Sequence, residues 1–314
     1  MEKDLQIEEI EFAKKTSYAI YENLTSVIFG ATTALRAAVL SAMTGKHLLL
    51  EDSPGVGKTQ LAKALAKSLG ANSSRIQGQP DLLPSDITGF SIYRDDLRTW
   101  EFRPGPVFSQ ILLLDELNRT PPRTQAALLE TMEERSVTID GTTHSLPDPH
   151  LVIATQNPLS QHGTYPLVES QMDRFGISVS MGYPSEHEEL GLVLQANDAI
   201  QPESLTQATD VEGWLRIQNA VKTVGLVPAV GEYAVRICRT TRIFPGVILG
   251  ASPRALLSLI DIAKAEAILC GRNYVTPQDL QNVTSLALSH RIIANGDPKS
   301  ILAEIISKTP APRP

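Results

Sequence analysis

Residues 48 to 59 read Leu48-Leu49-Leu50-Glu51-Asp52-Ser53-Pro54-Gly55-Val56-Gly57-Lys58-Thr59. The three leucines are typical of a buried strand, and a glycine-containing loop follows them directly. Beyond the loop, Leu61, Leu65 and Leu69 recur at the spacing of one helix face. A strand, a loop and a helix in this order predict a nucleoside triphosphate site, because loop N–H groups and the helix N-terminus attract phosphate.

Each part of this loop has an expected task. Gly55 and Gly57 let the backbone approach phosphate oxygens without a Cβ in the way. Lys58 would place a positive charge at the β- and γ-phosphates, and the Thr59 hydroxyl would ligate Mg²⁺. Asp52 stands where the general pattern has its first glycine, and a chance Gly-Lys-Thr at a helix start is the alternative for this segment alone. The residues expected to hold the phosphates are Ser53, Pro54, Gly55, Val56, Gly57, Lys58, Thr59 and Gln60.

The composition is that of an ordinary globular chain with a core. Of 314 residues, 42% are hydrophobic and 20% charged, and the net charge of −7 argues against a broad nucleic-acid-binding surface. Cys238 and Cys270 have no metal or redox spacing, so we expect two reduced core residues. The N-terminus lacks an apolar signal core and no stretch is long enough to span a membrane, so we expect a soluble, cytoplasmic protein.

The apolar pattern predicts an α/β fold with a parallel sheet covered by helices on both faces. The reason is that short continuous apolar runs alternate with helical patterns. The expected strands are Leu48–Leu50, Ile111–Leu114, Leu151–Ala154 and Ile177–Ser180, and the expected helices are Leu5–Leu24, Thr32–Met43, Gln125–Met132 and those that begin after Ser252 and Thr276. Past Tyr183-Pro184 the strand-like runs stop. We therefore predict a nucleotide-binding core at 1–190, a linker at 191–209 and a helical domain at 210–314.

Two segments depart from a simple alternation of strands and helices. The stretch Gln77–Pro106 is rich in Pro, Gly and Asp and too long for a simple connection, which indicates an insertion with a functional surface. Residues 137–144 alternate about Asp140-Gly141, a strong signal for a β-hairpin.

Further polar residues follow the other expected strands. Asp115 and Glu116 end the run Ile111–Leu114, where Asp115 would hold Mg²⁺ and Glu116 would polarise the attacking water. Asn157 ends the next strand and would contact the γ-phosphate, although an Asn that caps a turn before Pro158 is the plainer reading. Arg174 alone would be a solvated or salt-bridged residue, and Arg254 follows a helix start from which it can reach a phosphate.

Taken together, these motifs resemble those of AAA+ ATPases, which have an αβα P-loop core followed by a helical lid. More narrowly, the chain resembles the MoxR family from about Val27 to Arg291. The segments that carry this resemblance are Asp115-Glu116-Leu117-Asn118-Arg119, Pro121–Glu130, Ala154-Thr155-Gln156-Asn157-Pro158, Gly163-Thr164-Tyr165-Pro166-Leu167, Gln171-Met172-Asp173-Arg174-Phe175, Gly250–Ala255 and Gly271–Val275.

The resemblance implies further roles. Asn157 would be sensor 1, Arg254 a sensor 2 that acts on its own subunit's nucleotide, and Arg174 an arginine finger offered to the neighbouring subunit. Ile28, Phe29 and Gly30, with Val27, would line the adenine pocket. The Gln77–Pro106 insertion would correspond to the family's helix-2 insert and the Asp140-Gly141 hairpin to its pre-sensor-1 hairpin, both facing a central pore or a partner.

The resemblance also implies ATP and Mg²⁺ as cofactors and a homo-oligomeric, hexameric ring. Such a ring would remodel or mature protein clients, sometimes with a von Willebrand factor A domain protein. The alternatives are the motor of a metal chelatase or a DNA-processing helicase, and a nucleotide-gated scaffold with little turnover. The acidic charge balance speaks against the helicase, and intact Lys58, Asp115 and Glu116 speak against the scaffold.

Overall fold

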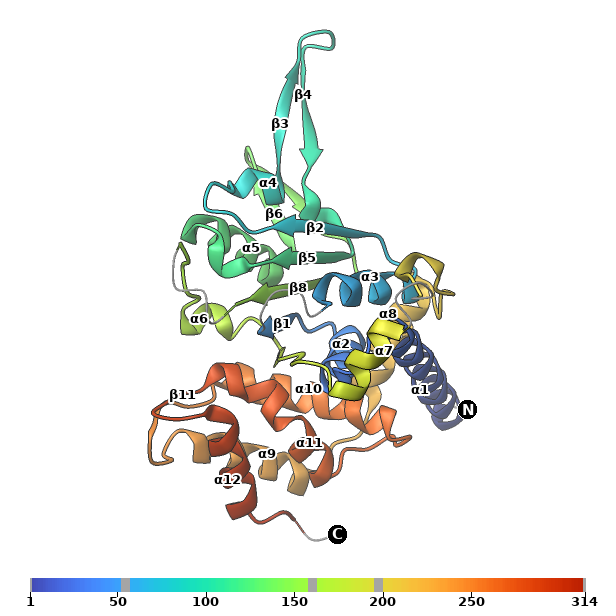
Figure 1. Ribbon diagram of the computed structural model, residues 1–314, viewed down its shortest axis with the longest axis vertical. Coiled ribbons are helices and arrows are strands. Elements are labelled where there is room, and N and C mark those ends of the chain that lie inside the picture. The colour runs from blue at the N-terminus through green and yellow to red at the C-terminus, as the bar shows by residue number, and fades with distance from the viewer. Residues whose placement is uncertain (1, 52–56, 158–162, 195–199, 313–314) are drawn as a thin grey trace.

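The computed structural model describes residues 2–51, 57–157, 163–194 and 200–312. The predicted phosphate-loop residues Asp52, Ser53, Pro54, Gly55 and Val56 lie outside the described residues. Figure 1 shows a sheet in the middle of the molecule, a long hairpin that projects at one end, and the C-terminal helices at the opposite end.

The central sheet is parallel throughout and has five strands in the order β2-β5-β8-β1-β9. This confirms the predicted α/β class. Alternate residues of β1 face opposite sides: Leu48 and Leu50 enter one apolar core and Leu49 the other. The strands of this sheet are β1 (Leu48–Glu51), β2 (Ser73–Gln77), β5 (Ile111–Asp115), β8 (Leu151–Gln156) and β9 (Ile177–Val179).

The helices of the first half include those predicted from the sequence, which begin within three residues of the expected positions. They are α1 (Glu2–Val27), α2 (Thr32–Thr44), α3 (Lys58–Ser68), α4 (Pro84–Thr88), α5 (Pro122–Glu134), α6 (Glu169–Met172) and α7 (Glu186–Leu194), with the 3₁₀ turns η1 (Pro106–Phe108), η2 (Leu117–Arg119) and η3 (Pro202–Ser204). α1 packs along α2, α3 and α8 (Val211–Thr223).

The predicted insertion is a folded element. After α4, the chain forms a two-stranded ribbon, β3 (Gly89–Arg94) and β4 (Thr99–Pro104), that extends away from the sheet (Figure 1). The predicted second hairpin is confirmed as well: β6 (Ser136–Ile139) pairs with β7 (Thr142–Ser145). Its turn residues Asp140 and Gly141 have φ of 50° and 78°, as a two-residue turn of this type requires.

The second half is mainly helical, as predicted, with one difference. Its helices after α8 are α9 (Pro228–Thr241), α10 (Pro253–Leu269), α11 (Pro277–Leu288) and α12 (Pro298–Lys308), with the turn η4 (Ser289–Arg291). Contrary to expectation, β10 (Val247–Leu249) and β11 (Ile293–Ala294) form a small antiparallel pair. These strands are short and none of their residues is buried, so they leave no apolar run in the sequence.

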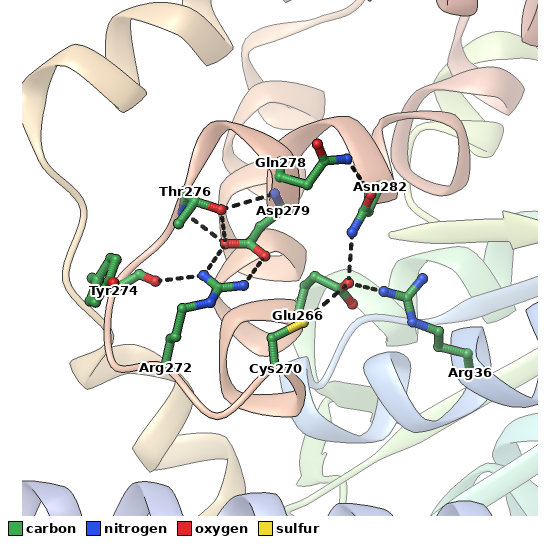
Figure 2. Close-up of polar contacts among 9 residues, drawn as sticks. All are labelled: Arg36, Glu266, Cys270, Arg272, Tyr274, Thr276, Gln278, Asp279 and Asn282. Carbon is green, nitrogen blue, oxygen red and sulfur yellow. Dashed lines mark hydrogen bonds and ion pairs between the residues drawn. The ribbon is translucent and has the colours of Figure 1, made fainter. Parts of the chain in front are cut away.

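Two buried acids organise the polar contacts inside this helical half (Figure 2). Asp279 binds both terminal nitrogens of Arg272 at 2.6 Å and accepts the Thr276 backbone N–H, which completes the capping box of α11. Glu266, on α10, is fully buried and paired with Arg36 of α2. Cys270 lies beside Glu266 but is exposed, so the expectation of two core cysteines is wrong for Cys270 and right for Cys238. Cys270 follows the last residue of α10, where the chain leaves the core.

One continuous apolar core joins the two halves. It contains Leu35 and Leu40 of α2 together with Leu259 and Ile262 of α10. The division of the chain at residues 190 and 210 therefore stays a prediction. Among the helices that the structure describes, none is both long and apolar enough to cross a membrane.

Candidate functional site

A cavity of about 280 Å³ opens at the carboxyl edge of the parallel sheet. The strand direction explains its composition, since residues that follow parallel strands meet at one edge. Its lining comes from the start of α3 and the ends of β2, β5 and β8, and consists of Gly57, Lys58, Thr59, Gln60, Arg75, Gln77, Asp115, Glu116, Thr155 and Asn157. The structure thus brings together the predicted residues Lys58, Thr59, Asp115, Glu116 and Asn157.

The oxygen donors for a divalent cation lie in this cavity. Asp115 is 7% exposed at the end of β5, and the Thr59 side chain belongs to the first turn of α3. Arg75 Nε donates to Asp115 Oδ2 at 2.7 Å, so the second carboxylate oxygen remains for a cation among the contacts that the structure describes. A hydroxyl and a carboxylate are the hard oxygen ligands that Mg²⁺ prefers, so these residues fit the predicted metal.

Glu116 is held in an unusual backbone conformation. Its φ of 58° and ψ of 51° lie in the left-handed region, which costs an ordinary residue of order 1–3 kcal/mol. The Glu116 N–H donates to Thr155 Oγ1 at 2.9 Å, and its carboxylate accepts Gln77 Nε2 at 2.9 Å and Arg119 Nη1 at 3.3 Å. Thr155 of β8 thus holds the backbone of Glu116, while Gln77 of β2 and Arg119 of η2 hold its carboxylate in the cavity.

Close backbone packing supports this strained position. The Gly78 N–H donates to the Asp115 carbonyl at 2.6 Å, and a Cβ at residue 78 would collide with the Glu116 carbonyl. On the other side, Asn118 Nδ2 donates to the Asn157 carbonyl at 3.2 Å. The end of β8 is thereby tied to the turn that carries Glu116.

The predicted adenine-pocket residues lie beside α7. Ile28 is buried, the Phe29 ring lies against Gly191, and Gly30 approaches the Glu188 carboxylate. None of the three lines the 280 Å³ cavity as the structure describes it. Their contact with a base stays a prediction.

A second, cation-rich cavity of about 310 Å³ opens at the opposite edge of the sheet. Its residues precede the strands: Lys46 and His47 come before β1, and Arg174 and Gly176 before β9. Arg254, at the start of α10, joins them there. Five cationic side chains line this cavity, namely Lys46, Arg135, Arg174, Arg254 and Arg291.

Arg174 and Arg254 share one counterion. Arg174 Nη1 lies 2.6 Å from Glu133 Oε2, and Arg254 Nη2 pairs with Glu133 Oε1. Arg174 Nη1 also donates to the Leu129 carbonyl at 2.6 Å. Both acceptor residues belong to α5. The structure therefore places the two arginines side by side on one carboxylate.

The expectation that Arg254 serves the nucleotide of its own subunit stays a prediction. Arg254 does not line the cavity that contains Lys58. β1, which separates the two edges, has four residues and spans ~13 Å at the usual rise per residue. A helix start gives an arginine reach toward phosphate, but the sequence does not say at which edge of the sheet the helix begins.

His47 is a neutral structural residue of the same edge. Its Nδ1 accepts the Val152 backbone N–H at 3.0 Å, and its Nε2 lies 3.3 Å from the Met132 carbonyl, to which it donates in this tautomer. Burial, reinforced by the nearby His150, lowers the pKa of His47 to about 3. Protonation of Nδ1 would also remove the acceptor for the Val152 N–H.

Sequence reasoning missed three residues of these sites: Arg75, Gln77 and Glu133. Arg75 and Gln77 lie on β2, an edge strand in which Ile76 alone is buried, so no apolar run marked it. Glu133 ends an amphipathic helix, where an acid is normally a solvated residue. Neither the polar sequence of β2 nor the end of α5 therefore indicated that these three residues contact site residues.

Comparison with known proteins agrees with the geometry of the first cavity. Residues 47–177 match the family model for the ATPase family associated with various cellular activities (AAA), and residues 239–308 match the AAA lid domain. The Bacillus subtilis protein YeaC is 44% identical over 93% of both chains, and the Mycobacterium tuberculosis chaperone MoxR1 is 38% identical over 89% of this chain and 76% of its own. A crystal structure from Cytophaga hutchinsonii, described as a candidate ATPase, covers 100% of both chains at 34% identity with a TM-score of 0.91. The chain therefore belongs to the MoxR family of AAA+ ATPases.

Proposed function

We propose that the protein hydrolyses ATP within a ring of identical subunits and uses the reaction to remodel or mature a protein client. The observation that carries this proposal is the separation of the two cavities. One edge of the sheet holds Lys58, Asp115 and Glu116, and the other holds Arg174 and Arg254. Each edge is half of a site, and a head-to-tail ring joins the two halves.

The carboxyl-edge cavity binds the nucleotide. Lys58 places its charge on the β- and γ-phosphates, and Thr59 and Asp115 hold Mg²⁺. When bound, Mg²⁺ neutralises part of the phosphate charge. Arg75 keeps the Asp115 carboxylate oriented through its 2.7 Å bond. Ile28, Phe29 and Gly30 contribute to the adenine pocket in this proposal.

Glu116 acts on the attacking water, and Asn157 acts on the γ-phosphate. Glu116 accepts a proton or a hydrogen bond from that water, and Gln77 and Arg119 fix its carboxylate. Asn157 lies across the same cavity and would contact the γ-phosphate. The strained φ of Glu116 supports a catalytic role, since such strain persists where the surroundings impose it.

The arginine-edge cavity would serve the neighbour's nucleotide. Arg174 and Arg254 line the cavity at the edge opposite to their own Lys58, with β1 between the two edges, which supports action on a neighbour's nucleotide. In a ring, this edge faces the Lys58 cavity of the next subunit. Both arginines would then stabilise the charge that develops on the transferred phosphoryl group.

The projecting ribbon offers a surface for a client. Trp100 is 70% exposed, and Phe90 and Leu97 are also exposed on the same ribbon. Such solvent-exposed large apolar side chains mark contact sites for other proteins. A hexameric ring, a von Willebrand factor A domain partner and a cytoplasmic location remain proposals that follow from the family.

A chelatase or helicase motor and a nucleotide-gated scaffold are the competing functions. The scaffold requires a defective site, yet Lys58, Asp115 and Glu116 lie together in one cavity. Neither the charge of the chain nor the geometry of its cavities favours DNA.

Mixing two inactive variants tests the proposal. Lys58→Ala removes the phosphate charge, and Arg174→Ala removes the arginine from the opposite edge. In a mixed ring, one type of interface pairs the intact Lys58 of an Arg174→Ala subunit with the intact Arg174 of a Lys58→Ala subunit. ATPase activity should therefore return in the mixture. Lys58→Ala alone should be inactive because it binds the phosphates poorly, and Arg174→Ala alone should lose a large part of the ~10³–10⁵-fold contribution typical of an arginine finger.

The same mixture made with Arg254→Ala distinguishes the two possible placements of Arg254. Rescue by Lys58→Ala supports action on the neighbour's nucleotide. No rescue, with normal rescue of Arg174→Ala, would show that Arg254 acts within its own subunit. Parent-like turnover of Arg174→Ala alone would make Arg174 a surface residue and refute the ring mechanism.

A further inference from the structure

Glu133 is the point at which Arg174 and Arg254 meet. One carboxylate oxygen pairs with each arginine, Oε2 with Arg174 at 2.6 Å and Oε1 with Arg254. Two guanidinium groups placed side by side repel each other unless an anion lies between them. Glu133 is therefore the residue that allows both arginines to occupy this edge together.

The contacts use only one nitrogen of each arginine. Arg174 is bound through Nη1, to Glu133 and to the Leu129 carbonyl, and Arg254 through Nη2. Within the part of the chain that the structure describes, Nε and the second terminal nitrogen of each arginine have no protein acceptor. Because guanidinium is a rigid planar fork, fixing one nitrogen orients the other donors as well.

The segment that carries Arg174 is fixed independently of Glu133. Arg291 Nη2 donates to the carbonyls of Asp173 and Phe175 at 3.0 and 2.7 Å, and Ser252 Oγ donates to the Asp173 carboxylate at 3.0 Å. The backbone on both sides of Arg174 is thus held by the helical half of the chain. Glu133 adds the contact that holds the guanidinium at the end of the Arg174 side chain.

We propose that Glu133 is a positioning residue for the reaction in the neighbouring subunit: it aims the remaining donors of Arg174 and Arg254 at one point, where a phosphate of the neighbour's nucleotide enters. The proposal rests on the proposed function, in which both arginines act across the interface. Lys46 and Arg135 line the same cavity and pair with Asp261 and Asp148. The five cationic side chains of the lining outnumber its two acids, Glu133 and Asp173, which keeps the cavity attractive to an anion.

Glu133→Gln is the test substitution, because glutamine has the same shape but no charge and one acceptor oxygen, so it cannot pair each arginine with an oxygen of its own. Glu134→Gln is the matched control, since Glu134 is the adjacent exposed acid of the same helix. In homogeneous rings, Glu133→Gln should lower kcat by roughly ten- to a hundredfold, a typical effect of misplacing catalytic groups. The Kd for ATP should not change, because Glu133 does not line the Lys58 cavity.

The mixed rings show which subunit needs Glu133. Adding Glu133→Gln to the Lys58→Ala subunit, which supplies the working arginines, should reduce the rescued activity. Adding it to the Arg174→Ala subunit, which supplies the working nucleotide cavity, should leave the rescue intact. Glu134→Gln should have no effect in either subunit.

The outcomes separate this proposal from the one on which it rests. If Lys58→Ala and Arg174→Ala fail to rescue each other, the ring mechanism fails and the role of Glu133 with it. Normal rescue that Glu133→Gln leaves unchanged, reduces equally in both subunits, or increases, would refute the positioning role alone. An equal reduction would indicate a structural defect, and an increase would show that Glu133 restrains the arginines.

Discussion

Two neutral histidines should make the fold sensitive to mild acid. His290 Nε2 donates to the Phe175 carbonyl at 2.9 Å, while its buried Nδ1 has no hydrogen-bond partner among the residues that the structure describes. Burial, and then the cation of Arg291, lower the pKa of His290 to about 3 from an ordinary value of 6.5. The pKa of His47 is lowered to about 3 as well, mainly by burial.

The sign and size of the effect follow from proton linkage. Below pH 6.5 the unfolded chain binds a proton at each histidine that the folded chain does not bind until about pH 3, so acid favours unfolding over this range. Between pH 7 and pH 5, each histidine removes about 2 kcal/mol from the free energy of unfolding. His47 and His290 together should remove about 4 kcal/mol, a large part of a typical domain's stability.

Urea unfolding at pH 7, 6 and 5, followed by circular dichroism, measures this loss. His290→Gln is the diagnostic variant, because its side-chain amide can still donate to the Phe175 carbonyl but does not titrate. Its free energy of unfolding should fall less than that of the parent between pH 7 and pH 5, by about 2 kcal/mol. Parallel pH profiles for the two proteins would refute the argument.

The remaining predictions concern catalysis, assembly and the helical half. Glu116→Gln should bind ATP like the parent in a fluorescence titration but turn over far more slowly; parent-like turnover would exclude Glu116 as the water-activating residue. ATP should enlarge the assembly, because Arg174 and the nucleotide would come from different subunits; sedimentation with a slowly hydrolysed analogue should show a larger species, and an unchanged monomer contradicts the ring. Asp279→Asn should cost about 3 kcal/mol in urea unfolding, because it leaves the Arg272 charge without its bidentate partner; a loss well below 1 kcal/mol would show that Arg272 finds other acceptors.

The sequence predicted the central strands because those strands are buried on both faces. β5 and β8 consist almost entirely of buried residues, so they appear as continuous apolar runs followed by polar ones. The polar residues that follow them, Asp115, Glu116 and Asn157, lie in one cavity as predicted. Strand direction alone is enough to bring them together.

The same reasoning fails for β2, the outermost strand of the sheet. β2 pairs on one side only and reads Ser-Ser-Arg-Ile-Gln, with Ile76 as its buried residue. Periodicity cannot distinguish such a strand from a loop. Arg75 and Gln77, which contact Asp115 and Glu116, were missed for that reason.

Arg254 shows why a helix start does not identify its ligand. The Ser252-Pro253 signal was correct: Ser252 Oγ accepts the Ala255 N–H at 3.0 Å, and α10 begins at Pro253. A capped helix start has the same local chemistry at either edge of a sheet, however, and the edge is decided by how α10 packs on α2, α8 and α11. Those contacts join residues far apart in the chain, so local patterns carry no record of them. In the structure they place Arg254 at the same end of the sheet as Arg174, so that the two arginines line one cavity.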